Sequence, residues 1–426
     1  MRLFTFILFF FLTLTAGAQH HDADYYIKQA KANSPLINRT QNENKIAGLD
    51  LEQLKRSLSK PEINLEAGIL FSPVISHDNG GNRLEVVSKD VINYNGYDMA
   101  MTDGGQYQSV VSLKQPLFTG SSVRTYENKT NVSRQINENV ISLTEHELER
   151  VVVQQYIVCL KTKKSVDLSR ELLTQAEDNL RLMKKLVENA VYSESDLMIL
   201  RIENDNYRLG LETFLSDYKN NLADLNILCG IADTAFVDLP DINLQLNKTN
   251  TSTSSFLTAY FLDSLNILAN QSVFELKYKP QLDFFANAGL NAVYLPAFNR
   301  LGVSTGLTFS WNIFDGWQRN IQMQKSEISK QSIDFEKRNF IRQRDVNRKN
   351  IDEQLKLIDN KILLITNQII QYTQLIQVYN ARLMAGEIPI MDYKNLLKDY
   401  AAKKHNLIVL GLEKQSLISY ANFWNY

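Results

Sequence analysis

The residue types that most often do chemistry are few in this chain of 426 residues, and they do not form catalytic patterns. The chain has five histidines and two cysteines. The histidines lack the spacing of a metal site, and the sequence contains no nucleophile elbow, phosphate loop or zinc motif. The sequence therefore predicts no enzymatic activity and no bound cofactor or metal.

The two cysteines, Cys159 and Cys229, leave two alternatives open. Counted from a turn near Tyr192, they stand 33 and 37 residues away on two helices that we expect to be antiparallel. Their heights along the helices would differ by only about 6 Å. An oxidising compartment would permit a disulfide between them, whereas buried free thiols are the commoner case. The sequence does not decide between these two states.

Two carboxylates, Asp196 and Asp392, stand at equivalent places in two similar segments that lie 196 positions apart. Ser193 and Asp196 have the spacing of a capping box at a helix start. Asp392 falls in the first helical turn after Pro389, where a carboxylate interacts favourably with the helix dipole. We therefore expect both aspartates to lie at helix N-termini.

Long helices are the elements that would position these carboxylates. Apolar residues recur every three or four positions from Gly120 to Val191, with no proline and no further glycine. A second run of similar length extends to Gly386. This spacing is typical of amphipathic helices. At the usual rise per residue, each helix would be about 105 Å long.

Residues that alternate between apolar and polar precede each long run. They predict strands over 61–71 and 107–118, and again over 281–293 and 301–313, whereas 73–106 resembles a loop. In the last strand, Leu307 and Phe309 share one face, and Ser304 and Thr308 share the other. Strands of this length and alternation are typical of membrane barrels, and the aromatic residues Tyr294, Phe298 and Trp311 fit a girdle at the membrane surface.

These elements predict a chain built from two internal repeats. Residues 1–18 have the pattern of a signal peptide, so the mature chain would begin at Gln19. The first repeat, 19–230, would contain a helix, a hairpin (61–118), a long helix and a return helix. A linker (231–254) would separate it from the second repeat, 255–426, which has the same order and a hairpin at 280–315.

Composition and length further limit the classes of protein that this sequence could belong to. The 46 basic and 47 acidic residues give no sign of a nucleic-acid partner. After the signal peptide, no apolar run reaches the length of a membrane helix, so membrane insertion would have to use the strands. Four strands cannot close a barrel, because the smallest known barrels have about eight. We therefore expect a mostly helical protein with membrane strands that oligomerises.

The motifs at the ends of these elements resemble those of the TolC family of outer-membrane efflux proteins. The strand-to-helix junctions read Gln-Pro-Leu-Phe-Thr-Gly at 115–120 and Trp-Asn-Ile-Phe-Asp-Gly at 311–316. A turn of pattern Gly-x-x-Ser-x-x-Asp occurs at 190–196 and at 386–392. The resemblance covers essentially the whole mature chain. The matching residues are Pro116, Gly120, Phe314 and Gly316 in the junctions, and Ala190, Ser193, Gly386 and Pro389 in the turns.

The resemblance implies a homotrimer in the outer membrane. Four strands from each chain would form a twelve-stranded barrel in contact with outer-membrane lipid, continued across the periplasm by a long antiparallel α-helical barrel. Such a channel works with a periplasmic adaptor (membrane fusion) protein and an inner-membrane pump of the resistance-nodulation-division or ABC type. The implied function is the export duct of a tripartite efflux or type I secretion system, in which the pump selects the substrate. The alternative is a secreted coiled-coil scaffold or adhesin that transports nothing.

The resemblance also implies a gate at the periplasmic tip. Asp392 matches an acidic ring position, and Asp196 matches a position that helps to hold the closed state. The next ring position would fall on the uncharged Asn395, and the usual tyrosine and arginine partners would fall on Leu383 and Ile388. Ala190 departs from the family's glycine, which would strain a left-handed turn residue. A purely structural role at a helix start remains the alternative for both aspartates.

Overall fold

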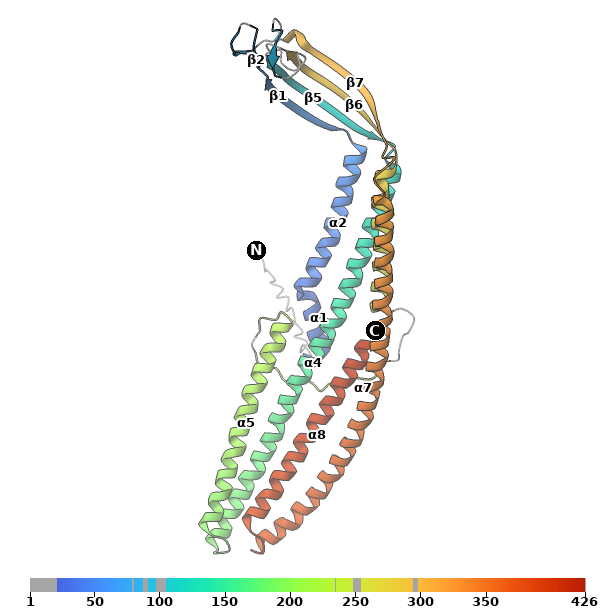
Figure 1. Cartoon of the computed structure of the whole chain (residues 1–426). Helices are drawn as coiled ribbons and strands as arrows, with labels where there is room; N and C mark the ends of the chain where they lie inside the picture. Colours follow the sequence, from blue (N-terminus) through green and yellow to red (C-terminus); the bar gives the residue numbers. More distant parts are fainter. Residues whose placement is uncertain are drawn as a thin grey trace, which may run out of the picture. The chain divides into compact units, whose positions relative to one another are not determined.

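The computed structural model describes residues 21–78, 80–86, 91–96, 105–233, 235–247, 254–293 and 298–425 (Figure 1). The expected signal peptide, 1–18, lies outside these residues, as do Tyr294 and the side chain of Phe298.

Helices make up most of the described chain, and the two longest are α4 and α7, with 69 and 67 residues. Both lie where the apolar spacing predicted them. No described helix is apolar enough over a sufficient length to cross a membrane. The α-helices are α1 (Ala23–Asn33), α2 (Pro35–Ser59), α4 (Gly120–Glu188), α5 (Glu194–Leu228), α6 (Ser255–Phe274), α7 (Gln318–Met384) and α8 (Ile390–Trp424), with short 3₁₀ helices η1 (Glu275–Tyr278) and η2 (Phe298–Arg300).

The four predicted strands form one antiparallel sheet in the order β1-β5-β6-β7. Its strands are β1 (Glu62–Phe71), β5 (Gly105–Leu117), β6 (Gln281–Val293) and β7 (Leu301–Ser310), so the last strand ends three residues before the predicted Ile313. The register aligns the faces across all four strands. One row of partners is Leu65, Val111, Ala288 and Val303, and the adjacent row is Asn64, Ser112, Asn287 and Ser304.

The segment expected to be a loop, 73–106, contains a second small sheet. Strands β2 (Val74–Ser76), β3 (Arg83–Glu85) and β4 (Tyr94–Asn95) pair in the order β3-β2-β4. The expectation of a loop was wrong for these residues because long-range contacts stabilise them. Val74 is fully buried, and the Asp78 carboxylate accepts hydrogen bonds from the backbone N–H groups of Ile92 and Asn93, both at 2.7 Å.

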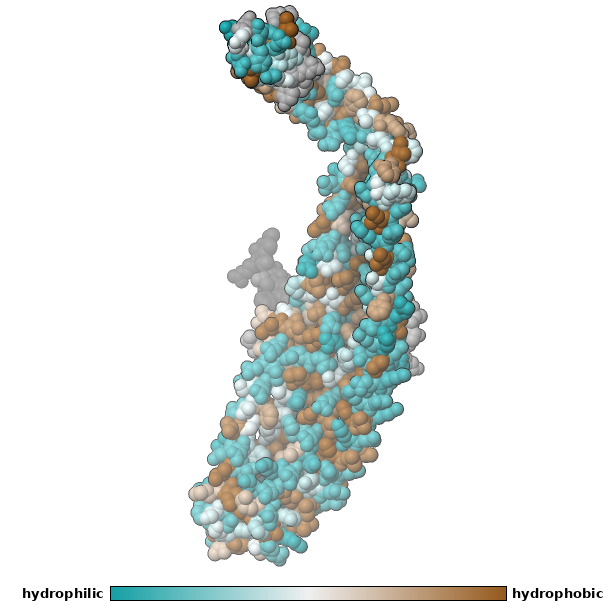
Figure 2. Space-filling view, viewed as in Figure 1, coloured by the Kyte–Doolittle hydropathy of each residue, from teal (hydrophilic) through white to brown (hydrophobic). Residues whose placement is uncertain are grey.

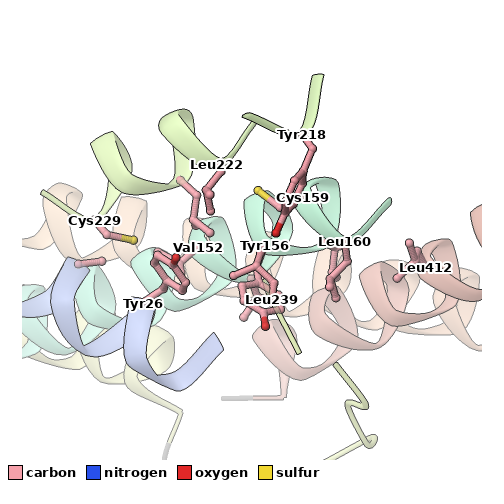
Figure 3. Packing of buried hydrophobic residues seen from close by; sticks show 14 of the residues in the cluster. Tyr26, Val152, Tyr156, Cys159, Leu160, Tyr218, Leu222, Cys229, Leu239 and Leu412 are labelled. Carbon is pink, nitrogen blue, oxygen red and sulfur yellow. The ribbon is translucent and has the colours of Figure 1, made fainter. Parts of the chain in front are cut away.

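The chain divides into two compact units, each built from both halves of the sequence. Unit 1 comprises Met1–Arg39, Val140–Leu257 and Arg338–Tyr426, and unit 2 comprises Thr40–Asn139 and Thr258–Lys337. The main apolar core of unit 1 lies where α1, α4 and α5 meet, around the buried rings of Tyr26, Tyr156 and Tyr218 (Figure 3). Unit 2 contains the four-stranded sheet and the helical segments joined to it.

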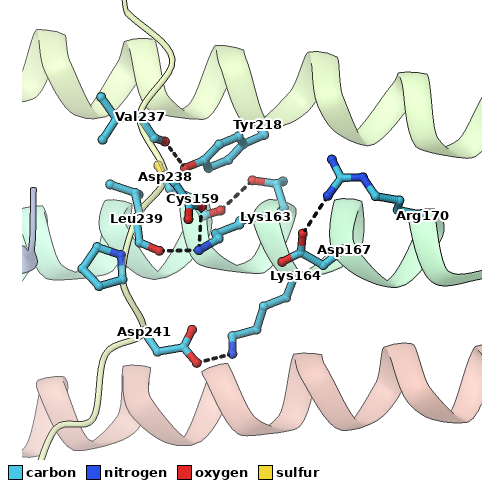
Figure 4. A network of polar contacts seen from close by, with 12 residues as sticks. Cys159, Lys163, Lys164, Asp167, Arg170, Tyr218, Val237, Asp238, Leu239 and Asp241 are labelled. Carbon is cyan, nitrogen blue, oxygen red and sulfur yellow. Dashed lines mark hydrogen bonds and ion pairs between the residues drawn. The ribbon is translucent and has the colours of Figure 1, made fainter.

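An extended segment of unit 1, residues 235–247, is held against the helices through its backbone carbonyls; we call it the strap. The hydroxyl of Tyr218 donates to Val237 O at 2.6 Å, and that of Tyr156 donates to Pro240 O at 2.7 Å. Lys163 Nζ donates to Leu239 O at 2.6 Å (Figure 4). From α8, Asn422 Nδ2 donates to Gln245 O at 2.8 Å. The strap therefore links α4, α5 and α8.

Both cysteines are free and buried, which decides between the two alternatives left open by the sequence. Cys159 Sγ donates to Asn221 O at 3.1 Å. Burial raises the pKa of each thiol to about 12, so both stay protonated near neutral pH.

Candidate functional site at the two helical turns

The turn between α4 and α5 and the turn between α7 and α8 contact each other at one end of unit 1 (Figure 1). The Tyr192 hydroxyl in the first turn donates to the backbone carbonyl of Ile388 in the second, at 2.8 Å. A Cβ atom added to Gly386 would lie 2.9 Å from Val191 Cγ1. The two turns are therefore closely packed, and Gly386 leaves the space that this packing needs.

Both turns have the same backbone conformation although their residues differ. Ala190 and Gly386 have φ angles of 58° and 72°, in the left-handed region. In the first turn, Val191 N donates to Leu186 O at 2.9 Å, and in the second, Glu387 N donates to Arg382 O at 3.0 Å. These bonds cap the carbonyls at the ends of α4 and α7. Ala190 thus keeps the turn geometry of a glycine, at a cost of about 1 kcal/mol for its Cβ.

Ser193 and Asp196 form the predicted capping box at the start of α5. The Asp196 carboxylate accepts from Ser193 N at 3.0 Å and from Ser193 Oγ at 2.6 Å. In return, Asp196 N donates to Ser193 Oγ at 3.3 Å. The contacts of Asp196 are therefore those of a residue that fixes the helix start.

Asp392 has a different environment at the start of α8. Pro389 is the N-cap residue and makes no side-chain cap hydrogen bond. The Asp392 carboxylate is exposed, and within the described part of the chain it has no ion pair or side-chain hydrogen bond. Asn395, one turn further along, is also exposed. Asp392 therefore presents a solvated negative charge beside the turn.

An apolar cluster with a polar centre lies beneath the turns. Tyr393 is fully buried, and its hydroxyl bonds to Asn380 Oδ1 at 2.5 Å and to Asn179 Oδ1 at 3.2 Å. Burial raises the pKa of Tyr393 to about 12, so the hydroxyl remains a donor. The other buried members of the cluster are Met183, Leu186, Leu197, Leu200, Leu383 and Ile390.

The two positions without the family's tyrosine and arginine have other contacts here. Leu383 packs in the apolar cluster, and Ile388 supplies the carbonyl that Tyr192 binds. A further link joins the two return helices, because Lys394 Nζ of α8 lies 3.7 Å from a Glu203 carboxylate oxygen of α5. Sequence reasoning missed Tyr192, Tyr393 and this ion pair. The sequence does show a tyrosine near the start of each return helix, which could have indicated these hydrogen bonds. It does not show which partner each hydroxyl contacts.

The predicted junction residues belong to unit 2. Pro116 pairs with Asp283 near the end of β5, and Gly120 is the first residue of α4. Gly316 has a φ angle of 67°, and the side chain of Phe314 is exposed. These residues turn the chain from a strand into a long helix. Among the described residues, no cluster of histidine, cysteine and carboxylate side chains has the composition of a metal site.

The sequence matches no established family profile and no curated protein. Solved structures do match. A membrane protein from Pseudomonas aeruginosa aligns with a TM-score of 0.69 at 15% identity, covering 95% of this chain and 89% of that one. The outer membrane protein VceC from Vibrio cholerae aligns with a TM-score of 0.69 at 13% identity, covering 95% of this chain and 96% of VceC. The CmeC outer membrane channel from Campylobacter jejuni aligns with a TM-score of 0.67 at 14% identity, covering 95% of this chain and 85% of CmeC. The resemblance to the TolC family is therefore confirmed at the level of the fold.

Proposed function

We propose that this chain is the outer-membrane channel of an export system, passing substrates from an inner-membrane pump and a periplasmic adaptor to the exterior. The observation that carries the proposal is the four-stranded sheet, which has one predominantly apolar face, exposed along both edge strands, and two unpaired edges in the single chain.

Apolar residues predominate on this face of every strand, with Ser109, Gln115 and Thr305 as exceptions. Leu65 in β1 is 70% exposed, and Val303 in β7 is 86% exposed. The opposite face is polar, with Lys114 Nζ 3.0 Å from an Asp283 carboxylate oxygen and Asn287 Nδ2 3.5 Å from Ser304 Oγ. Exposing such an apolar surface to water is unfavourable by about 25 cal/mol per Å². Lipid on the apolar face and water on the polar face would suit the alternation of a membrane barrel.

The sheet edges support an assembly of three copies. β1 and β7 each present unpaired backbone groups, which cannot remain unpaired inside a bilayer. Three chains would supply twelve strands, and β1 of each would pair with β7 of the next. In this arrangement, the long helices would form the antiparallel α-helical barrel below the strands. The signal peptide (1–18), the two repeats (19–230 and 255–426) and the linker (231–254) are part of the same proposal.

The gate of the proposed channel would be the ring of three Asp392 carboxylates. Asp392 supports this role because it is exposed and has no described partner, whereas Asp196 is bound within its own capping box. Asp196 would act by keeping the turn in shape. The channel would lie in the outer membrane with its helices in the periplasm, and the pump would be of the resistance-nodulation-division or ABC type.

Cell fractionation combined with unheated gel electrophoresis tests the proposal. We expect the protein in the outer-membrane fraction, migrating as a trimer without heating and as a monomer after heating. A soluble product, or a monomer in unheated samples, would favour a secreted scaffold or adhesin. In that case the strands would be ordinary hairpins.

A further inference from the structure

One end of the four-stranded sheet gathers large aromatic side chains and lysines. The register places the start of β1, the end of β5, the start of β6 and the end of β7 at this same end, where Glu62 pairs with Lys114 and Leu117 pairs with Leu282. Hydrophobic residues reach the surface where the sheet meets the helices (Figure 2). We call this region, residues 274–280 and 311–319 together with Phe118 and Ser121, the junction.

The aromatic side chains of the junction are held outward. Phe118 is 89% exposed and Trp317 is 67% exposed, and both have left-handed backbones, with φ angles of 57° and 67°. Phe314 and Trp311 are exposed as well. A left-handed conformation is uncommon for bulky residues and costs free energy. Such strain persists only where the surroundings fix the backbone.

For Trp317, which lies between Asp315 and Arg319, a polar network provides that fixation. Trp311 Nε1 donates to Tyr278 O at 3.1 Å, and the Tyr278 hydroxyl bonds to the Asp315 carboxylate. Asp315 also accepts from Arg319 N at 2.9 Å, and the Arg319 guanidinium lies 2.6 Å from a Glu275 carboxylate oxygen. The nearby carboxylates are therefore already bound to partners within the network.

Two lysines of the junction have no carboxylate within ion-pair distance among the described residues. Lys277 Nζ lies 3.8 Å from the centre of the Phe274 ring, and Lys279 Nζ donates to Ser121 Oγ at 2.7 Å. Both side chains are exposed. The junction thus combines two exposed ammonium groups, of which Lys277 also interacts electrostatically with Asp315, with outward aromatic rings, and it continues directly from the apolar face of the sheet.

We propose that the junction binds the phosphodiester headgroups of anionic phospholipids in the leaflet that faces the periplasm. This inference rests on the proposed function, because it requires the sheet to lie in a membrane. Aromatic rings favour the headgroup level of a bilayer, and lysines near the surface attract anionic lipids. Lys277 and Lys279 would contact the phosphate, while Phe118, Trp311 and Trp317 contact the upper acyl chains.

The chain carries its own probe for this site. It has three tryptophans, of which Trp311 and Trp317 lie in the junction and Trp424 lies in unit 1. Trp424→Phe therefore leaves tryptophans only in the junction, and excitation at the red edge of the absorption band avoids the 19 tyrosines. We would reconstitute this full-length variant into phosphatidylcholine vesicles that contain brominated phosphatidylcholine or brominated phosphatidylglycerol. The expected result is quenching by both lipids, with binding of phosphatidylglycerol favoured by about fivefold at low salt and less at high salt.

Substitutions distinguish an effect of these two lysines from an effect of the overall charge of the protein. In the Trp424→Phe background, Lys277→Gln with Lys279→Gln should abolish the preference for phosphatidylglycerol, and Lys277→Arg with Lys279→Arg should retain it. Lys184→Gln with Lys185→Gln removes two exposed lysines near the end of α4 and should leave the preference unchanged.

Two outcomes overturn the inference while leaving the proposed function intact. One is equal quenching of the parent variant by both brominated lipids, and the other is a preference that does not change with salt. The salt series needs no lysine variant, so it decides the question even if the glutamine variants fail to insert. Absence of quenching by any brominated lipid would reject the membrane location itself, and the proposed function with it.

Discussion

Two aspartates at equivalent positions of the turns have different surroundings. Asp196 accepts two hydrogen bonds from Ser193, whereas Asp392 is exposed beside an N-cap proline. Identical residue types in matching motifs therefore have different contacts. The capping box was predictable because its spacing is local. The pairing of Tyr192 with Ile388 was not, because it depends on how two turns 196 residues apart meet.

The first prediction concerns the charge of Asp392. If three copies surround one axis, like charges at a narrow opening concentrate counter-ions, so the closed channel should prefer cations and be blocked by multivalent cations. Asp392→Asn should weaken both properties with little loss of assembly. Single-channel recordings in a planar bilayer measure the reversal potential and the block.

Ser193→Ala is the matched control for the gate. It should lower the free energy of unfolding by about 1 kcal/mol through loss of the cap and leave selectivity unchanged. An Asp392→Asn channel with the wild-type reversal potential and block would assign Asp392 to the helix start alone.

The second prediction concerns His146, whose ring stacks on Phe423 at 4.8 Å between centroids and whose Nε2 lies 2.9 Å from Phe423 O. Burial lowers the pKa of His146 below its usual 6.5, although the Phe423 carbonyl and Glu149 act in the opposite direction. The unfolded chain therefore binds a proton more readily than the folded one. Stability should be full above about pH 6.5 and fall as the pH drops below that value.

His146→Gln should flatten this acid dependence. Denaturant unfolding of wild type and variant at about pH 7.5 and pH 5.5 measures it. Burial also lowers the pKa of His405, but that residue is common to both proteins, so the difference between them reports on His146. If the free energy of unfolding fell by the same amount between these two pH values in wild type and variant, His146 would contribute nothing to the acid sensitivity.

At the scale of elements, the strands test the membrane assignment. Arginine at Leu307, on the apolar face, should destabilise the assembled channel by about 2–4 kcal/mol if the residue lies near the bilayer midplane. Arginine at Thr308, on the polar face, should be tolerated better. The amount of heat-sensitive trimer on gels measures both. Equal tolerance of the two substitutions would remove the barrel assignment.

The periodicity of apolar residues in the sequence was enough to predict the positions of the long helices and the four main strands. Each of these elements has a continuous pattern of residues that face either solvent or the core. The pairing of β5 with β6, which joins residues from the two halves into one sheet, follows from the fold and not from the period. The β3-β2-β4 sheet was missed because its strands have only two or three residues and depend on the Asp78 carboxylate.

At the scale of the whole molecule, the burial of apolar side chains is uneven. The three described clusters of buried apolar residues lie in unit 1, whereas every residue of β1 is exposed in the single chain. The sequence could predict an oligomer from the small number of strands, but not which unit would hold the core. Unit 2 should therefore depend on lipid and neighbouring copies for its stability.

Hydrogen exchange tests this dependence. In detergent-solubilised monomer, the amides of β1 and β7 should exchange much faster than those of α4 beside the apolar cluster at the turns. Assembly into the trimer should protect both edge strands, because their free N–H groups would then pair. Equal exchange of β1 and β7 in monomer and trimer would argue against edge pairing between copies.

The strap has a consequence for how the sequence can vary. Tyr156, Lys163, Tyr218 and Asn422 all donate to its backbone carbonyls, which any amino acid provides. Evolutionary drift should therefore be permitted at the exposed positions of 235–247 and restricted at the four donors and at Leu239, which is fully buried in the core of unit 1. In a saturation mutagenesis experiment, the exposed positions of the strap should be tolerant, whereas Leu239 and the four donors in the helices should be intolerant. Conserved residues here would mark the donors that hold the segment and the side chain it buries, while its exposed positions could diverge widely between relatives.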